Sequence, residues 1–208
     1  MGLKRWYDAH VMPRLITCAC GQEGIERRRR EIVPLARGRV LELGCGGGLN
    51  QQFYEAGRIS AFAGIDPHEK LLEGARARAS AHGWDVDIRA GVAEDLPFAT
   101  GSFDTVVCTY TLCSVEDPER VLAEVRRVLA PGGRLLFLEH GRAPDQAVAR
   151  WQERIEPVWK PLAGCHLPRP VGAALRAAGF AVEPLGQAYL RQAPKIMGWM
   201  EWGVARKA

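Results

Sequence analysis

Residues 40–48 read VLELGCGGG, and this stretch decides the fold. Its apolar half stops abruptly in a glycine turn, and a helical pattern begins at Leu49, which predicts a buried parallel strand that ends in a tight turn. The spacing differs from the dinucleotide-binding fingerprint, because Leu49 stands where that fingerprint has its third glycine. The glycines instead leave room for a ligand to lie against bare backbone at the end of the strand.

A second acidic residue, Asp66, follows the glycine turn by about 20 residues. Residues 61–66 read AFAGID and predict the next buried strand, with Asp66 at its carboxyl end. An acid about 20 residues beyond such a glycine turn binds two ribose hydroxyls through paired hydrogen bonds. No Gly-Lys-Ser/Thr follows the turn, which argues against a phosphate cradle. We therefore expect a nucleoside site, and the alternative is an α/β fold whose tight turn binds no nucleotide.

Apolar strands alternate with amphipathic helices along the rest of the chain. This alternation predicts one α/β domain over residues 1–208, a doubly wound seven-stranded sheet with helices on both faces. Six strands should be parallel and the last antiparallel. The predicted strands are 39–43, 61–65, 85–90, 105–109, 134–139, 180–185 and 195–204. The predicted helices are 22–36, 49–56, 68–82, 118–129 and 171–178, and residues 131–133 (Pro-Gly-Gly) should form the turn before the fifth strand.

Two segments fall outside this alternation. Residues 1–37 are expected to form an N-terminal helical cap. Residues 142–170 carry Trp151, Trp159 and several prolines, so the segment is too long for a simple connection and too structured in composition for a linker. We expect this insertion to be a lid over the active site.

The composition favours a soluble globular protein of one domain. The chain has 208 residues, of which 47% are hydrophobic and 25% charged, both ordinary values. No run of 18 apolar residues predicts a membrane span, and the start lacks the apolar core of a signal peptide. The six cysteines at 18, 20, 45, 108, 113 and 165 do not form a disulfide framework, so we expect a reducing cytoplasm.

The net charge of +4 has its most conspicuous cluster at Arg27–Arg30. Consecutive helical residues point about 100° apart, so these side chains cannot form one stripe. We expect a solvated helix face that Glu23, Glu26 and Glu31 partly compensate, and the alternative is a weak attraction to an anionic membrane surface or acidic ligand. The aromatic interleaving that stacks bases is absent, so a nucleic acid partner is not expected.

Together with three further motifs, the glycine turn and Asp66 resemble class I S-adenosylmethionine-dependent methyltransferases. The further motifs are GVAEDLPF at 91–98, SFDTVVC at 102–108 and EVRRVLAPGG at 124–133. The resemblance implies a Rossmann-like sheet whose glycine turn holds the methionine part of the cofactor, while Asp66 holds its ribose. After methyl transfer the cofactor would become S-adenosylhomocysteine. It also implies that the backbone near Ala93 and the side chain near Glu94 contact the adenine, although family members often place an acid where Val92 stands.

The resemblance assigns a set of residues to the cofactor, with Tyr7 closing over its methionine end. This set is Tyr7, Glu42, Gly44, Cys45, Gly46, Gly48, Asn50, Asp66, Pro67, Val92, Ala93, Glu94, Cys108, Thr109 and Leu112.

A narrower resemblance concerns the methyl acceptor. The segments CTYTLCSV (108–115), FLEH (137–140), WQE (151–153), PVW (157–159) and GCHL (164–167) are similar to the microsomal alkyl-thiol S-methyltransferases and their bacterial relatives. This implies a small thiol or sulfide acceptor. The microsomal members have an apolar anchor at the amino end that is not evident here, so at most a weak peripheral membrane contact is expected.

Two alternatives to thiol methylation remain open. Tyr7-Asp8 resembles small bacterial phosphatidylethanolamine N-methyltransferases, which makes a phospholipid headgroup or small amine a rival acceptor. A module that senses S-adenosylmethionine without turnover is the rival outside enzymes. The sequence does not indicate an oligomeric state.

Two histidines are candidates for catalysis. A thiol acceptor must react as thiolate, and an amine must be neutral, so a base is needed in either case. His140, directly after the fifth strand and beside Glu139, is the first candidate for a base or thiolate-stabilising partner; His166, beside Cys165 in the insertion, is the second. A structural histidine is the alternative for each. Cys113 and Cys165 are expected to contact substrate, contact each other, or simply pack as small apolar side chains.

A metal site is not expected. Cys18, Cys20, Cys165 and His166 would offer four soft ligands on paper. The Cys-x-Cys spacing is shorter than the usual gap between zinc ligands, however, and the two pairs lie far apart in sequence.

Overall fold

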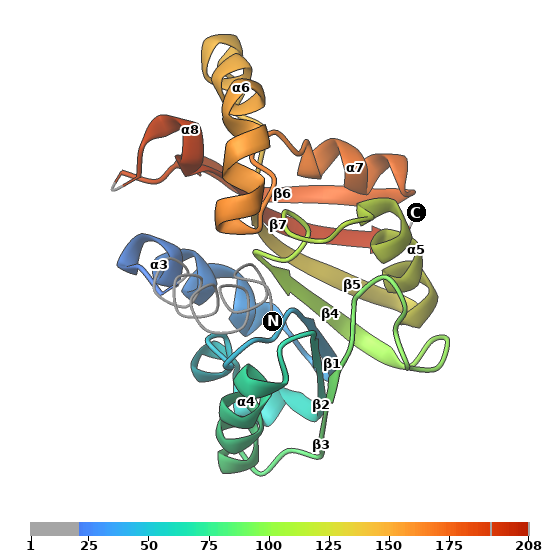
Figure 1. Cartoon of the computed structure of the whole chain (residues 1–208). Helices are drawn as coiled ribbons and strands as arrows, with labels where there is room; N and C mark the ends of the chain where they lie inside the picture. The colour runs from blue at the N-terminus through green and yellow to red at the C-terminus, as the bar shows by residue number, and fades with distance from the viewer. Residues whose placement is uncertain (1–20, 192, 208) are drawn as a thin grey trace.

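The computed structural model describes residues 21–191 and 193–207 (Figure 1). The strands are β1 (Gly38–Leu43), β2 (Ile59–Asp66), β3 (Val86–Ala90), β4 (Phe103–Thr109), β5 (Leu129–His140), β6 (Phe180–Tyr189) and β7 (Trp199–Lys207). They form one seven-stranded sheet in the order β3-β2-β1-β4-β5-β7-β6. Strand β7 is antiparallel to both of its neighbours, and all other adjacent pairs are parallel. The predicted sheet is thus confirmed.

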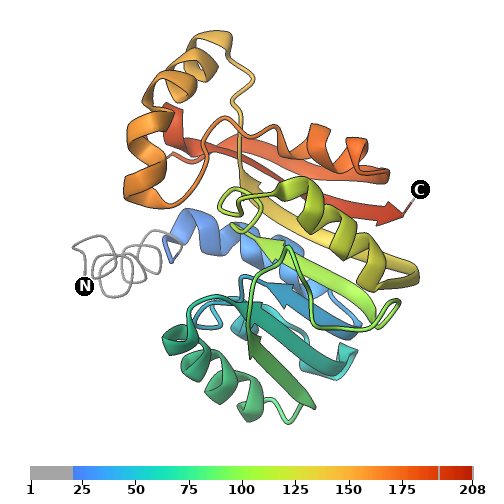
Figure 2. The same cartoon turned by 45° about the vertical axis from the view of Figure 1, so that its right-hand side comes forward.

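Helices cover both faces of this sheet (Figure 2). The α-helices are α3 (Glu23–Ile32), α4 (Glu69–Ala81), α5 (Pro118–Val128), α6 (Gln146–Ala163), α7 (Val171–Ala177) and α8 (Lys195–Gly198). One buried cluster joins α5 and α7 to the sheet through side chains such as Leu122 and Leu175. The other joins α3 and α4 through Ile32 and Leu72. Because neighbouring residues of β5 alternate between the two clusters, the sheet is buried on both sides, as a parallel sheet requires.

Helix α6 accounts for most of the predicted 142–170 insertion. It lies beside α8 and projects beyond the sheet (Figure 1). Its interior contains Pro157 and Pro161. The helix ends at Ala163 and is capped by Gly164, whose positive φ of 73° is the left-handed conformation. No helix in the described part of the chain combines the length and apolar character needed to cross a bilayer.

The predicted helix over 49–56 is wrong. The chain instead forms two short 3-10 turns, η2 (Gln51–Phe53) and η3 (Ala56–Arg58). The side chains of Asn50 and Tyr54 reach back to Glu42 at the end of β1, at 2.9 Å each. These bonds hold the segment against the strand, where a regular helix would carry it away.

Two predicted element boundaries also need correction. Residues 131–133 lie inside β5 rather than before it, and Gly132 takes a φ of 72° where the pairing with β4 shifts register. This is the geometry of a bulge. The predicted strand over 195–204 begins as helix α8, and β7 starts only at Trp199.

The Arg27–Arg30 cluster is only partly a solvated face. Arg28 pairs with Glu31 at 2.8 Å, as expected. Arg29, however, is 4% exposed and donates to the side chain of Asn50 at 2.5 Å. Since 100° steps spread four residues around a helix, one of the four had to face the core.

Candidate active site

The strand order reverses direction at β1, because β2 and β3 lie on one side of it and β4 on the other. In open α/β sheets this reversal leaves a crevice at the carboxyl ends of the strands, where ligands bind. Strands β1, β2 and β4 end there, at Leu43, Asp66 and Thr109. The glycine turn at 44–48 and Asp66 therefore meet at the crevice, as the sequence predicts.

The glycines of the turn serve different purposes. Gly44, Gly46 and Gly48 all have positive φ, at 61°, 47° and 80°. A Cβ on Gly44 would overlap the hydroxyl of Thr111, so this position permits close packing. A Cβ on Gly46 would meet nothing nearer than the Oδ2 atom of Asp66 at 3.9 Å. Gly46 therefore borders open space beside the predicted sugar-binding acid.

Asp66 is fixed by backbone groups on both carboxylate oxygens. Gly46 N–H donates to Oδ2 at 3.0 Å, and His68 N–H donates to Oδ1 at 2.8 Å. The residue is 7% exposed. The ring Nδ1 of His68 also lies 3.1 Å from Oδ1. A carboxylate oxygen has about two lone-pair positions, so Oδ2, which faces Gly46, keeps one free for a further donor. This free acceptor position and the open space at Gly46 fit a ribose hydroxyl.

A buried polar network lies beneath the turn. Glu42 accepts from Asn50 at Oε1 and from Tyr54 at Oε2, and Asn50 also donates to Thr109 at 3.0 Å. Burial raises the pKa of Glu42 to about 7, although the hydrogen bond from Tyr54 and the charge of Arg29 act to lower it. All of these side chains are buried, so they hold β1, β4 and the turn together.

The loop after β3 carries the residues that the sequence predicts to contact the adenine, Val92, Ala93 and Glu94. Val92 is exposed and Ala93 buried. Glu94 accepts two backbone bonds at Oε1, from Glu116 at 3.0 Å and Asp117 at 3.4 Å, which ties this loop to the start of α5.

The remaining predicted cofactor residues differ in exposure. Pro67 is exposed beside Asp66. Cys45, Cys108 and Leu112 are buried. Burial raises the pKa of both thiols, so neither is a ready thiolate. Tyr7 and Asp8 lie outside the described residues.

Glu139, next to the first catalytic candidate, is structural. It is fully buried and accepts from the backbone N–H groups of Thr111, Leu112 and Cys113 at 2.9, 3.0 and 3.2 Å. Burial raises the pKa of this carboxyl, and the three N–H groups oppose that shift. Its lone pairs are committed to the loop after β4, which begins with Tyr110 at the unusual φ of 57°.

The two predicted histidines share one neighbourhood. His140 contacts Cys165, and its ring centre lies 6.2 Å from that of Tyr110. Burial acts to lower the pKa of His140, but Cys165 and the nearby carboxylates outweigh it, so the pKa is raised. His166 follows Cys165 directly, and its backbone N–H donates to Cys113 at 2.7 Å. Burial and the charge of Arg169 lower the pKa of His166.

Sequence reasoning missed several participants in this region. Tyr54 and Arg29 complete the network around Glu42, and Glu156 binds His166. No pattern in the sequence singles out Glu156, which lies on α6 ten residues before His166. Within residues 21–191 and 193–207, no three His, Cys, Asp or Glu side chains gather as metal ligands, and Cys18 and Cys20 lie outside this range.

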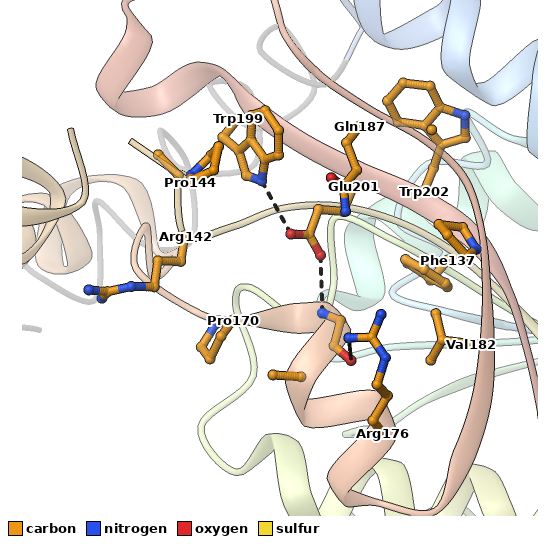
Figure 3. A pocket seen from close by; sticks show the side chains of 15 residues that line it. Phe137, Arg142, Pro144, Pro170, Arg176, Val182, Gln187, Trp199, Glu201 and Trp202 are labelled. Atoms are coloured by element: carbon orange, nitrogen blue, oxygen red, sulfur yellow. Dashed lines mark hydrogen bonds between the residues drawn. The ribbon is translucent and has the colours of Figure 1, made fainter. Parts of the chain in front are cut away.

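A separate cavity of about 420 Å³ lies between α7, β6 and β7 (Figure 3). Arg142, Arg176, Trp199 and Glu201 are among its lining residues, and none of the predicted site residues is. Glu201 points toward the start of α7 and accepts from Gly172 N–H at 3.1 Å and from the Trp199 indole at 3.2 Å. Its carboxylate therefore braces α7 against β7.

Comparison with known proteins agrees with this geometry. A family model described as a methyltransferase domain matches residues 41–137. Human thiol S-methyltransferase TMT1B is 38% identical over 190 residues, covering 84% of this chain and 78% of that protein. A phosphatidylethanolamine N-methyltransferase of Cereibacter sphaeroides is 34% identical over 139 residues, covering 64% and 68%. A solved S-adenosylmethionine-dependent methyltransferase of Mesorhizobium loti has the same fold, with a TM-score of 0.64, 21% identity and coverage of 90% and 99%.

Proposed function

Because the chain belongs to the family of S-adenosylmethionine-dependent methyltransferases, we propose that it methylates a small thiol or sulfide. The enzyme class and the cofactor follow from the family. The acceptor is supported by the likeness to a thiol S-methyltransferase over most of the chain, including the segment that carries His140 and His166. The observation that carries the proposal is the meeting of these two histidines with Cys165 and the loop after β4, near the cofactor crevice.

The cofactor is proposed to lie with its ribose on Asp66 and its methionine part on the turn from Gly44 to Gly48. The open space at Gly46 and the free acceptor position on Oδ2 of Asp66 support this placement. Glu42, Asn50 and Thr109 do not contact the cofactor in this arrangement. Their hydrogen bonds to one another fix the glycine turn that does. Ala93 and Glu94 border the adenine in this arrangement.

S-adenosylmethionine supplies an activated methyl group, so the protein's work is positioning and proton removal. The acceptor sulfur must lie in line with the methyl carbon at about 3–3.5 Å, with water excluded. The insertion at 142–170 is proposed to close over the acceptor. A histidine removes the proton of a thiol, because the thiolate is the nucleophile. From a thiol the products are a thioether, S-adenosylhomocysteine and a proton.

A panel assay tests the proposed acceptor. The protein is incubated with methyl-labelled cofactor and separate thiols, sulfides, amines and phenols, and products are followed by mass spectrometry. We expect label on thiols or sulfides. Label on an amine alone would refute the proposal and favour the phosphatidylethanolamine-type reaction, which the likeness to the Cereibacter enzyme supports as second candidate. That reaction also predicts salt-sensitive binding to anionic vesicles containing phosphatidylethanolamine.

We also propose a reducing, cytoplasmic setting. Cys45, Cys108, Cys113 and Cys165 are free thiols in the described part of the chain, which supports such a compartment. Fractionation of cells that express the tagged chain would test it, and recovery with membranes after a high-salt wash would contradict it.

A further inference from the structure

The side chain of Glu156 binds the short segment that follows α6 through both of its carboxylate oxygens. Its Oε1 atom lies 2.5 Å from Nδ1 of His166, and its Oε2 atom accepts from Leu167 N–H at 3.1 Å. An ionised carboxylate only accepts hydrogen bonds, so Nδ1 of His166 must carry the proton. In neutral imidazole the other nitrogen, Nε2, then keeps its lone pair.

That second nitrogen has no partner. Nε2 of His166 is buried, and no described residue lies within hydrogen-bonding reach of it. Buried acceptors normally have a partner, and an exception calls for an explanation such as a bound molecule. The ring cannot readily turn away, because Glu156 holds one side and the backbone of His166 is bonded to Cys113.

We propose that His166 takes the proton of the acceptor thiol and that Glu156 is the positioning residue that fixes its reactive tautomer. This inference rests on the proposed function. The S–H bond of the acceptor breaks and its proton forms a bond to Nε2 of His166. The electron pair left on the acceptor sulfur forms the new S–CH₃ bond, and the pair of the broken methyl–sulfonium bond stays on the departing thioether sulfur. The imidazolium then releases its proton to solvent.

The surrounding charges suit this role. His166 faces Glu156 and Lys160 on α6, Arg169 after it, and Glu116, which pairs with Lys160 at 3.0 Å. Burial and Arg169 lower the pKa of His166, so the ring is neutral and able to accept a proton at pH 7. The pKa of His140 is raised, because Cys165 and the nearby carboxylates outweigh the effect of its burial.

A substrate preference follows from this assignment. A thiol has a proton to give to Nε2, whereas a sulfide has none. The geometry therefore selects thiols over sulfides within the proposed acceptor class.

Glu156→Gln tests the role of the carboxylate, with Glu153→Gln as the matched control. Glu153 lies one turn earlier on α6 and makes only an exposed pair with Arg142 at 2.6 Å. The carboxylate of Glu156 accepts from His166 Nδ1 and from Leu167 N–H, one on each oxygen. A glutamine has a single oxygen, so it can replace only one of these two acceptors. We expect kcat for a thiol to fall by about 10- to 100-fold, with little change in KM for the cofactor. The acid limb of the kcat profile should move to lower pH, because Glu156 acts to raise the pKa of His166.

Two further measurements keep the inference falsifiable if the variant folds poorly. Nitrogen-15 NMR of the unsubstituted protein should show His166 protonated at Nδ1 and bare at Nε2. Adding Glu156→Gln to His166→Ala should cause no further loss of turnover, because residues acting through one group are not additive. A proton on Nε2, or a Glu156→Gln variant that behaves like Glu153→Gln, would overturn the inference while thiol turnover persists. If the unsubstituted protein methylates no thiol at all, the proposed function itself has failed.

Discussion

Asp66 joins the two halves of the cofactor crevice, because both of its carboxylate oxygens accept hydrogen bonds. One oxygen holds the glycine turn and the other holds the start of the segment after β2. The same carboxylate is proposed to bind the ribose, so its loss removes charge-assisted bonds to the ligand and loosens the turn at once.

Asp66→Ala is expected to weaken S-adenosylhomocysteine binding by about 1.5–3 kcal/mol. Isothermal titration calorimetry measures this directly. Asp87→Ala is the control, since Asp87 lies on the neighbouring strand β3 and pairs only with exposed Arg89. Equal affinities for the Asp66 variant and the unsubstituted protein would contradict the ribose role.

His140→Ala is expected to lower turnover by about 10²-fold while leaving cofactor affinity nearly unchanged. The reason is that His140 contacts Cys165 rather than any part of the glycine turn. Steady-state kinetics and calorimetry separate the two effects. Unchanged turnover would make His140 a structural residue.

Glu42 gives stability a pH dependence of definite sign. Its pKa is raised from 4.5 to about 7 in the folded state, so its contribution is fully present below pH 4.5 and is lost as pH rises through 7. The difference in unfolding free energy between the unsubstituted protein and Glu42→Gln should fall by about 3 kcal/mol from pH 4 to pH 8. Urea unfolding at several pH values tests this, and a flat difference would rule it out.

At the scale of elements, α6 buries two side chains against the domain, Ala149 and Gln152, and Gln152 is the polar one. Gln152 is 1% exposed; its oxygen accepts from Ala143 N–H at 2.9 Å, and its amide donates to the carbonyls of Gly141 and Ile196 at 3.1 Å each. These bonds connect α6 to the end of β5 and to α8. The exposed ion pairs of α6 contribute little by comparison.

Gln152→Leu should therefore loosen α6 more than it unfolds the sheet. It leaves one N–H and two carbonyl groups buried without partners, at a cost of about 1–3 kcal/mol each. Hydrogen exchange followed by mass spectrometry should show faster exchange in 146–163 than in β4. Exposed Gln146→Leu, at the start of the same helix, should exchange as the unsubstituted protein does.

The errors of prediction at this scale share a physical cause. Hydrophobic periodicity predicted β1, β2 and the order of helices, because burial on two faces shapes those segments. It failed at 49–56, where Asn50 is fully buried by its bonds to Glu42 and Thr109, a long-range effect that no local pattern carries. It failed again at 195–204, where the alternation of apolar residues continued through a helical turn.

The candidate site was predictable in part for the same reason. Gly46 and Asp66 sit at strand ends, and strand ends converge by the rule of parallel sheets. His140 and His166 could be named as candidates, but their common neighbourhood depends on how α6 folds back. Glu156 could not be found at all, because nothing in its sequence context distinguishes it from Glu153.

For the whole molecule, cofactor binding should be visible as a gain in stability. A ligand present at 100 times its Kd adds about 2.7 kcal/mol when only the folded state binds it. S-adenosylhomocysteine should accordingly raise the midpoint of thermal unfolding by roughly 5–10 °C for a chain of this length. NAD, which shares the adenosine part but adds a pyrophosphate, should raise it far less, because the glycine turn lacks the dinucleotide spacing. Equal shifts would contradict the identification of the cofactor.

The clamp formed by Glu139 bears on how quickly the enzyme can work. It anchors the loop after β4 at three amides, and Thr111 of that loop also donates to Leu43 at the end of β1, at 2.9 Å. The loop, which would form one wall of the proposed acceptor site, is thus fixed by the protein's own hydrogen bonds before any substrate arrives. Little conformational entropy is left to lose there when the acceptor docks, so binding energy is free to align sulfur and methyl.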